Sequence, residues 1–286
     1  MKVKVGLLTL LLNSSILPLP NFVNAAFEPR AVGARPISLG QAFVAGQDDG
    51  SLVFWNPAGL AALPQSILEF TYEDLYSQGL VTFSHLAFAR PDIGPGTLGI
   101  SWTRLGVTSK VPFEYSENTY SVGYATRVLR TLNVGGTLNL YRLSSVVNGS
   151  GFGASLGAQF QPVPMLILGA SYQNAGRTTI RYDSGAVDPL PDNLRLGLAL
   201  LFNRAKIYAD ADQVTEKTVL HCGLELAVFE HTLELRGGVS QRTDRASDLT
   251  YAVGFGLRIR LVEIDYAFEN HFDLGASHVV SAVWRF

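Results

Sequence analysis

The stretch Leu249-Thr-Tyr-Ala-Val-Gly-Phe-Gly-Leu-Arg-Ile-Arg-Leu261 alternates between large apolar side chains and small or charged ones. Because successive side chains of a β-strand point to opposite faces, this pattern predicts a strand with one apolar and one polar face. Residues 262–269 repeat the alternation in shifted phase, which predicts a tight turn near 260–262. Glycine, alanine and a few charges form the polar faces of these and similar segments, which suits the crowded polar lumen of a barrel better than a water-exposed sheet.

The composition excludes several classes of protein. Charged residues make up 16% of the 286 residues, against roughly 25% in ordinary soluble domains. The net charge of −2 gives no indication of a nucleic-acid partner. After the first 25 residues, no segment approaches the run of about 18 apolar residues that would predict a membrane-spanning helix. A secreted β-sandwich and an outer-membrane β-barrel remain.

The N-terminus has the three parts of a secretory signal peptide. Lys2 and Lys4 precede a short apolar run, and Val23-Asn-Ala25 provides small residues at a cleavage point. We expect cleavage after Ala25. The sequence therefore divides into a signal peptide over 1–25, a second segment over 26–66 and alternating strands over 67–286, and it predicts export to the outer membrane of a Gram-negative bacterium.

The alternating segments predict an all-β protein, a transmembrane antiparallel β-barrel of about fourteen strands. An even number of strands of about ten residues is typical of single-chain bacterial barrels. The expected strands are 67–75, 79–89, 97–107, 117–128, 131–143, 151–161, 165–175, 192–203, 205–213, 218–229, 232–240, 248–260, 262–269 and 275–286.

The lengths of the connections support the barrel independently. The longer connections all follow odd-numbered strands: 108–116, 144–150, 176–191, 241–247 and 270–274. Short turns follow even-numbered strands, with 90–96 as a mild exception. Long outer loops and short periplasmic turns distinguish these barrels, and a sandwich has no reason to sort its loops in this way. The N-terminus is therefore expected in the periplasm or in the lumen.

Two further features concern the wall. Trp284 and Phe286 end the last strand on its apolar face, in the manner of the signal that the outer-membrane assembly machinery recognises. In the second strand the apolar phase changes between Phe83 and Leu86. This change predicts a bulge near Ser84-His85, interpreted either as a functional opening of the wall or as a local irregularity.

Residues 26–66 do not alternate as membrane strands do. They contain several glycines, small apolar residues and an Asn-Pro turn, which indicate a compact element packed against something else. Ahead of a closed barrel, the expected location of this element is the lumen, where it would act as a plug or hatch.

This segment resembles the N-terminal signature of the PorV/PorQ family, within the wider group typified by the fatty-acid transporter FadL, whose hatch also has an Asn-Pro-Ala element. The resemblance extends to the last hairpin and implies a fourteen-stranded barrel whose hatch includes Arg35, Gly40, Trp55, Asn56, Pro57 and Ala58. The matching stretches are Gly33-Ala-Arg35, Leu39-Gly-Gln-Ala-Phe-Val-Ala45, Asp48-Asp49, Phe54-Trp-Asn-Pro-Ala-Gly-Leu60, Ile264-Asp-Tyr-Ala-Phe268, Asp273-Leu-Gly275 and His278-Val-Val-Ser281.

The sequence offers little catalytic chemistry, and we expect no enzyme, no metal and no cofactor. No histidine pair has metal-ligand spacing and Cys222 is the only cysteine. Ser281 faces the lumen beside Glu263 or Asp265, but His278 lies on the opposite face, which disfavours a hydrolase. The inward charges are expected to pair across the lumen and with the hatch. They are Arg195, Lys206, Asp210, Asp212, Glu225, Glu234, Arg236, Arg258, Arg260, Glu263 and Asp265.

Two functions from different classes follow from the resemblance. The first is a plugged conduit for hydrophobic small molecules, released into the bilayer through a gap in the wall. The second is an accessory barrel of a protein-secretion system that passes exported proteins to the cell surface. The expected partners are outer-membrane lipid, the barrel assembly machinery, and either a hydrophobic ligand or secretion-system proteins. A general diffusion pore is disfavoured because a hatch would occlude the lumen.

Overall fold

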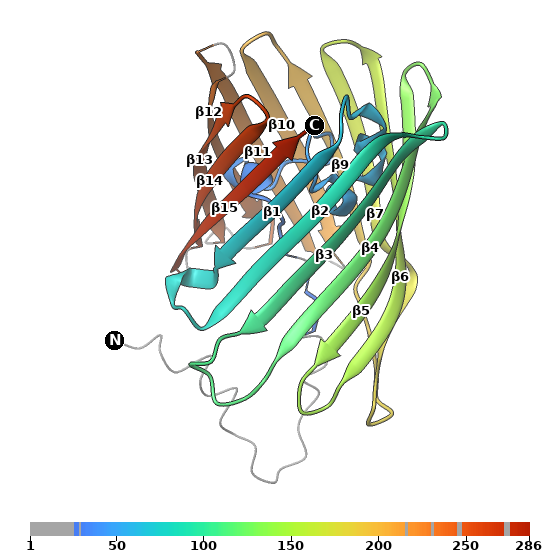
Figure 1. Ribbon diagram of the computed structural model, residues 1–286, viewed down its shortest axis with the longest axis vertical. Coiled ribbons are helices and arrows are strands. Elements are labelled where there is room, and N and C mark those ends of the chain that lie inside the picture. The colour runs from blue at the N-terminus through green and yellow to red at the C-terminus, as the bar shows by residue number, and fades with distance from the viewer. Residues whose placement is uncertain (1–25, 29, 215–216, 230–231, 245–247, 272–274) are drawn as a thin grey trace.

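The computed structural model describes residues 26–28, 30–214, 217–229, 232–244, 248–271 and 275–286, which form a closed antiparallel β-barrel (Figure 1). Fourteen long strands follow one another around the wall, and the barrel closes where β1 pairs with β15. The strands are β1 (Ile67–Asp74), β2 (Val81–Ile93), β3 (Gly96–Val107), β4 (Ser116–Leu129), β5 (Leu132–Ser144), β6 (Gly149–Val163), β7 (Leu166–Tyr182), β9 (Asn193–Leu201), β10 (Ala205–Val214), β11 (Lys217–Val228), β12 (Leu233–Arg242), β13 (Leu249–Ile259), β14 (Val262–His271) and β15 (Gly275–Arg285), with the short β8 (Val187–Pro189) beside β7.

The predicted fold and strand count are confirmed, with differences at the strand ends. The segment 90–96 is no exception to the loop pattern, because β2 continues to Ile93 and β3 begins at Gly96, across a tight turn in which Gly94 has φ 61°. The predicted loop 176–191 is partly a hairpin, since β7 extends to Tyr182 and pairs with β8. The predicted signal peptide, residues 1–25, lies outside the described residues.

The outer face of the wall is apolar. Along β13, Tyr251 is 47% and Val253 is 52% exposed, whereas Ala252 between them is buried toward the lumen. A continuous exposed apolar band of this kind is covered by lipid in membrane barrels. Among the residues that the structure describes, no helix is long and apolar enough to cross a bilayer.

The two ends of the barrel differ in their connections. The longer connections, such as 108–115 between β3 and β4, lie at the lower end in Figure 1, and the C-terminus lies toward the short-turn end. The segment before β1 enters the lumen and forms the predicted hatch. It contains α2 (Ala34–Ser38), α3 (Leu52–Trp55) and the 3₁₀ helix η2 (Pro57–Ala62); a further 3₁₀ turn, η3 (Leu75–Ser77), follows β1.

The predicted wall bulge at Ser84-His85 is wrong. β2 keeps a continuous register with both β1 and β3 through this region. The apolar phase changes because Phe83 faces the lumen, where it packs in one buried cluster with Val32 and Leu75. The sequence pattern therefore suggested a change of face because a large apolar side chain, Phe83, points into the lumen of a regular strand.

The regular pairing of the wall is instead interrupted in β7. The register between β6 and β7 shifts between two residue pairs, Phe152 with Thr179 and Leu156 with Tyr172. Four residue steps on β6 therefore lie opposite seven residue steps on β7. Within this stretch Asn174, Gly176 and Arg177 have positive φ. Such a bulge bends a strand and locally ends its pairing.

Candidate functional site

Asn56 connects the hatch to the wall. It is fully buried, and its side-chain oxygen accepts a hydrogen bond from Ala58 N at 3.1 Å, which caps η2 at its first turn. Its side-chain nitrogen donates to Val44 O at 2.8 Å and to Ala158 O of β6 at 3.1 Å. The Asn56 side-chain amide thus forms hydrogen bonds with the first turn of η2, with the backbone of residue 44 in the hatch and with the backbone of β6 in the wall.

Glycines in the wall make this contact possible. A Cβ atom at Gly157 would overlap the Asn56 side-chain oxygen and lie 2.9 Å from Pro57 Cδ. A Cβ atom at Gly135 would lie 2.7 Å from the carbonyl carbon of Pro57. The Asn-Pro element therefore packs directly on the wall backbone of β5 and β6, which explains why these inward positions lack side chains.

Carboxylates of the wall hold the hatch backbone. Asp210 of β10 accepts hydrogen bonds from Phe43 N at 2.6 Å and Val44 N at 2.8 Å. Glu69 of β1 accepts from the N–H groups of residues 50 and 51, at 2.9 and 3.1 Å. Hydrogen bonds of this type satisfy the non-repetitive backbone of the hatch and give each buried carboxyl group partners.

Arg35 is the main charged anchor of the hatch. Its Nε and Nη2 donate to the two oxygens of Glu225 at 2.8 and 3.1 Å, a two-pronged geometry that fixes orientation. Its Nη1 donates to Gln47 O at 3.0 Å. Burial by itself would lower the pKa of Arg35, but the nearby Glu225 carboxylate raises it well above the usual value, so the guanidinium stays charged.

The predicted pairing of inward charges is confirmed with one correction. Arg236 contacts Glu225 and Asp265, and Arg258 pairs with Glu263 at 2.7 Å. Arg260, however, does not face the lumen. It follows the end of β13 as an exposed turn residue with φ 58°, because the strand ends one residue earlier than the alternation suggested.

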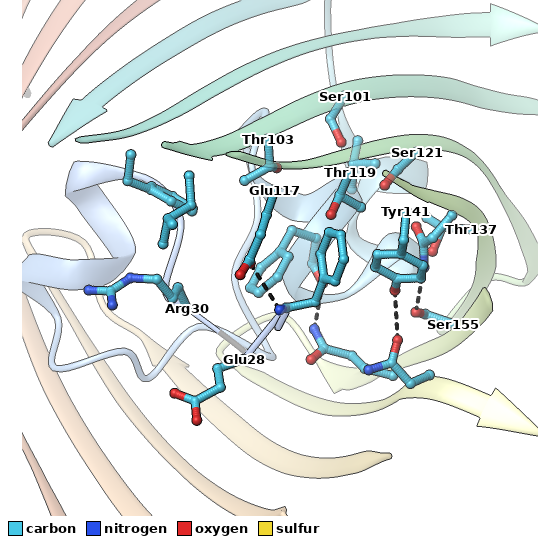
Figure 2. A pocket seen from close by; sticks show the side chains of 18 residues that line it. Glu28, Arg30, Ser101, Thr103, Glu117, Thr119, Ser121, Thr137, Tyr141 and Ser155 are labelled. Carbon is cyan, nitrogen blue, oxygen red and sulfur yellow. Dashed lines mark hydrogen bonds between the residues drawn. The ribbon is translucent and has the colours of Figure 1, made fainter. Parts of the chain in front are cut away.

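The inner cavity is a space of about 100 Å³ between the hatch and the wall. Phe27, Phe54 and Phe83 supply aromatic surface to it, and the strands β3 to β6 supply hydroxyl groups (Figure 2). The hydroxyl-bearing residues are Ser101, Thr103, Thr119, Ser121, Thr137 and Ser155, and those of β3 and β4 point from the wall into the cavity.

The N-terminal part of the hatch lines one part of this cavity. Phe27 packs edge-on against Tyr141 with ring centroids 5.1 Å apart, and its N–H donates to Glu117 at 2.9 Å. Tyr141 donates in turn to the Asn174 side chain at 2.7 Å, which lies in the β7 bulge. The cavity therefore borders the interrupted part of the wall.

The outer vestibule is a larger cavity of about 1170 Å³ toward the long connections. Its lining includes Arg195 and His221, which face the lumen. Tyr172 also lines it, although its cross-strand partners Leu156 and Leu194 lie on the outer face, so the lining reaches the outer face at this point of β7. Arg195 stacks 4.7 Å above the Trp55 ring and pairs with Asp212 at 2.7 Å. The vestibule thus reaches the hatch below and the β7 bulge at its side.

The remaining predicted residues take separate positions. Trp55 donates to Val32 O at 2.8 Å within the hatch core, and Gly40, with φ 63°, accepts at its carbonyl from the His221 ring. His85 is buried, 3.0 Å from Thr103, and Ser84 faces outward. Trp284 and Phe286 are half exposed on the outer face, where Phe286 stacks on Phe88. None of these six predicted residues lines either cavity.

The sequence did not single out the residues of the inner cavity. Phe27 lies in a segment without periodicity, and the inward hydroxyls look like ordinary polar residues of a barrel lumen. The concentration of Ser and Thr on the inward positions of β3 to β6 was the available signal.

By parity His278 was expected away from Ser281, and it does lie on the outer face, 2.6 Å from the Tyr266 hydroxyl. Within the described ranges, no group of three or more potential metal ligands is found.

Fold and lumen together define a plugged transmembrane β-barrel. No family model matches the chain, and no curated protein matches it in sequence. The fold is similar to that of the Pseudomonas putida toluene transporter TodX (TM-score 0.67, 16% identity, 89% of this chain and 98% of that one). It is also similar to that of a Pseudomonas aeruginosa FadL homologue (TM-score 0.69, 13% identity, 92% of this chain and 100% of that one). These similarities show that the chain has a FadL-like fold.

Proposed function

We propose that this protein is an outer-membrane channel for small hydrophobic molecules, in particular for molecules with a single aromatic ring. The observation that supports this proposal is the inner cavity, whose lining combines three phenylalanine rings with hydroxyl groups. An engineered apolar cavity of about 150 Å³ accommodates benzene in another protein. The inner cavity, at about 100 Å³, is smaller, so a single small ring is the largest cargo that we propose for it, and an extended acyl chain is too large. A structural neighbour, a TodX mutant, is described as a monoaromatic hydrocarbon channel.

The route that we propose has three steps. A molecule enters the outer vestibule from the side of the long connections and reaches the inner cavity when Phe27 moves away from Tyr141. It then leaves past Asn174 and Gly176, where β7 is interrupted, into the bilayer. The hatch prevents free passage of water-soluble solutes during this process.

A matched pair of variants tests the proposal, because Ser121 and Val122 are neighbours on β4 with opposite orientations. Ser121→Phe places a ring in the inner cavity, whereas Val122→Phe places the same ring in the lipid. We expect the first variant to reduce the uptake of labelled toluene into reconstituted vesicles at least about fivefold and the second to leave it unchanged. Equal uptake by both variants would contradict the proposal.

The PorV/PorQ resemblance supports a second candidate, an accessory role in protein secretion. One structural feature favours it, a hollow of about 840 Å³ between the β3–β4 and β5–β6 connections, lined by residues such as Pro112, Phe113 and Asn148. Cross-linking from a photoreactive residue at position 113 in cells tests this role. Recovery of an exported protein on the cross-linker would favour secretion over uptake.

A further inference from the structure

A row of polar side chains crosses the outer face of one side of the barrel. Direct partners in antiparallel strands share one face of the sheet, so the register identifies neighbours from strand to strand. Figure 1 shows β2 to β7 side by side, and the register aligns in order Ser84, Arg104, Asn118, Arg142, Ser150 and Arg181 across them. We call Arg104, Arg142 and Arg181 the arginine row.

The arginine row points away from the lumen. Its three members are exposed, whereas their chain neighbours Leu105, Leu143 and Ile180 are partly or fully buried on the lumen side. None of the three arginines forms an ion pair or a hydrogen bond through its side chain with any residue in the described part of the chain. Three unpaired guanidinium groups thus lie on the outer face of the barrel, where Arg104 also borders the hollow between the β3–β4 and β5–β6 connections.

The row lies close to the strand ends that carry the long connections, since Arg104, Arg142 and Arg181 come one to three residues before the ends of β3, β5 and β7. The next outward row toward the short turns is apolar and aromatic, formed by Leu86, Trp102, Tyr120, Leu140 and Phe152. Trp102 Nε1 donates to the Asn118 side chain at 3.1 Å and connects the two rows. Aromatic girdles mark the boundary between hydrocarbon and head groups in membrane barrels, so arginines beside an aromatic row, on the side of the long connections, have the arrangement expected of residues that meet lipid head groups.

The rest of the barrel has no such feature. Among the described residues, the outward positions of β9 to β15 hold no lysine or arginine; β13, for example, presents Leu249, Tyr251, Val253, Phe255, Leu257 and Ile259. Neither the arginine row nor the adjacent aromatic row contains an acidic residue. If cations were required all around the barrel at the membrane surface, the strands β9 to β15 would also carry them. The restriction of the arginine row to β3–β7 therefore indicates a local role.

The spacing of the row indicates the chemistry of its partner. Adjacent strands lie about 4.8 Å apart, so arginines on every second strand are roughly 10 Å apart and the row spans about 20 Å. Each guanidinium group can bind the oxygens of a phosphate in a forked geometry. Because the row is much longer than one phosphate group, a single phosphate can contact only part of it. We propose that the arginine row binds a glycolipid of the outer leaflet that carries at least two phosphate groups.

This inference rests on the outer-membrane location proposed above, with the long connections outside, but not on what passes through the lumen. Its test therefore uses lipid binding, and the transport assay serves as an independent readout. The bisphosphorylated lipid A disaccharide is the probe, and its enzymatically dephosphorylated form is the matched ligand. Purified full-length protein in non-ionic detergent is titrated with each lipid, and bound lipid is counted by native mass spectrometry.

The variant combines Arg104→Gln, Arg142→Gln and Arg181→Gln. A control combines Arg90→Gln, Arg130→Gln and Arg204→Gln, which removes the same charge from exposed positions near the short turns. We expect lipid A to bind the row variant at least about tenfold more weakly than the wild type, and the control less than about twofold more weakly. The dephosphorylated lipid should bind the wild type at least about tenfold more weakly.

Several results would overturn the inference. They are unchanged binding in the row variant, an equal loss in the control, equal binding of the dephosphorylated lipid, or equally effective competition by phosphatidylglycerol. If the triple variant fails to fold, the comparison of the two lipids on the wild type still decides. Toluene uptake should be unchanged in the row variant, and Ser121→Phe should retain lipid binding, so that the lipid site and the proposed transport can fail separately.

Discussion

Toward β10–β15 the hatch packs on glycines and also forms ion pairs with wall carboxylates. Toward β3–β6 it meets glycines, hydroxyl groups and a single carboxylate, Glu117, and leaves a cavity. On the charged side, Arg35 pairs with Glu225, and Asp210 holds the backbone of residues 43 and 44. On the hydroxyl side, the Asn56 amide and close apolar packing make the contact. The same plug is thus attached to the wall by two different kinds of interaction.

The difference shows which part of the hatch can move at lower cost. Separating a buried ion pair leaves uncompensated charges in a medium of low dielectric constant, which is strongly unfavourable. Neutral hydrogen bonds and van der Waals contacts are individually weaker. We therefore expect the charged side to act as a fixed anchor and the side that faces the inner cavity to adjust when a ligand enters.

The largest effect is expected from breaking the anchor. Arg35→Ala removes the partner of a buried carboxylate and should lower the free energy of unfolding by about 3–5 kcal/mol. The measurement is urea-dependent unfolding in lipid vesicles, followed by tryptophan fluorescence. Arg90→Ala, at an exposed position, is the control and should change stability by less than about 0.5 kcal/mol. A similar small change in both variants would show that the charged side does not anchor the hatch.

A smaller effect is expected where the hatch packs on the wall. Gly157→Ala places a methyl group against Asn56 and Pro57 and should destabilise the protein by about 1–3 kcal/mol. Gly237→Ala on β12 is the control, because its Cβ atom would have no neighbour closer than 4.0 Å. Adding Asn56→Ala to Gly157→Ala removes the clashing oxygen, so the combined loss should be smaller than the sum of the two single losses. Additive losses would indicate that the two residues do not meet.

The smallest effect concerns the polarity of the cavity. Thr119→Val keeps the shape of the side chain and removes a hydroxyl group that points into the inner cavity. We expect the ratio of phenol to toluene uptake to fall about two- to threefold, which corresponds to one neutral hydrogen bond of about 0.5 kcal/mol. Tyr120→Phe removes a hydroxyl from the outer face and should leave the ratio unchanged. An equal shift in both variants would assign the effect to the bilayer rather than to the cavity.

The sequence predicted the wall well because alternation is a local property. Whether Tyr251 or Ala252 faces the lipid depends on their own polarity and on the pleat of a single strand. The same logic failed where a large apolar residue faces inward, as at Phe83, and where a strand ends early, as before Arg260. In both cases the neighbours that decide the orientation lie outside the strand itself.

The sequence alone determined the barrel class, the strand order and the sorting of long and short connections, because each follows from residues adjacent in the chain. It also marked the segment before Ile67 as something other than a strand. Only the tertiary structure decided where that segment makes contact: Asn56 reaches Ala158, 102 residues away, and Phe27 reaches Glu117, 90 residues away. The cavity, the β7 interruption and the arginine row depend on register and close packing between distant segments, and no local pattern encodes these.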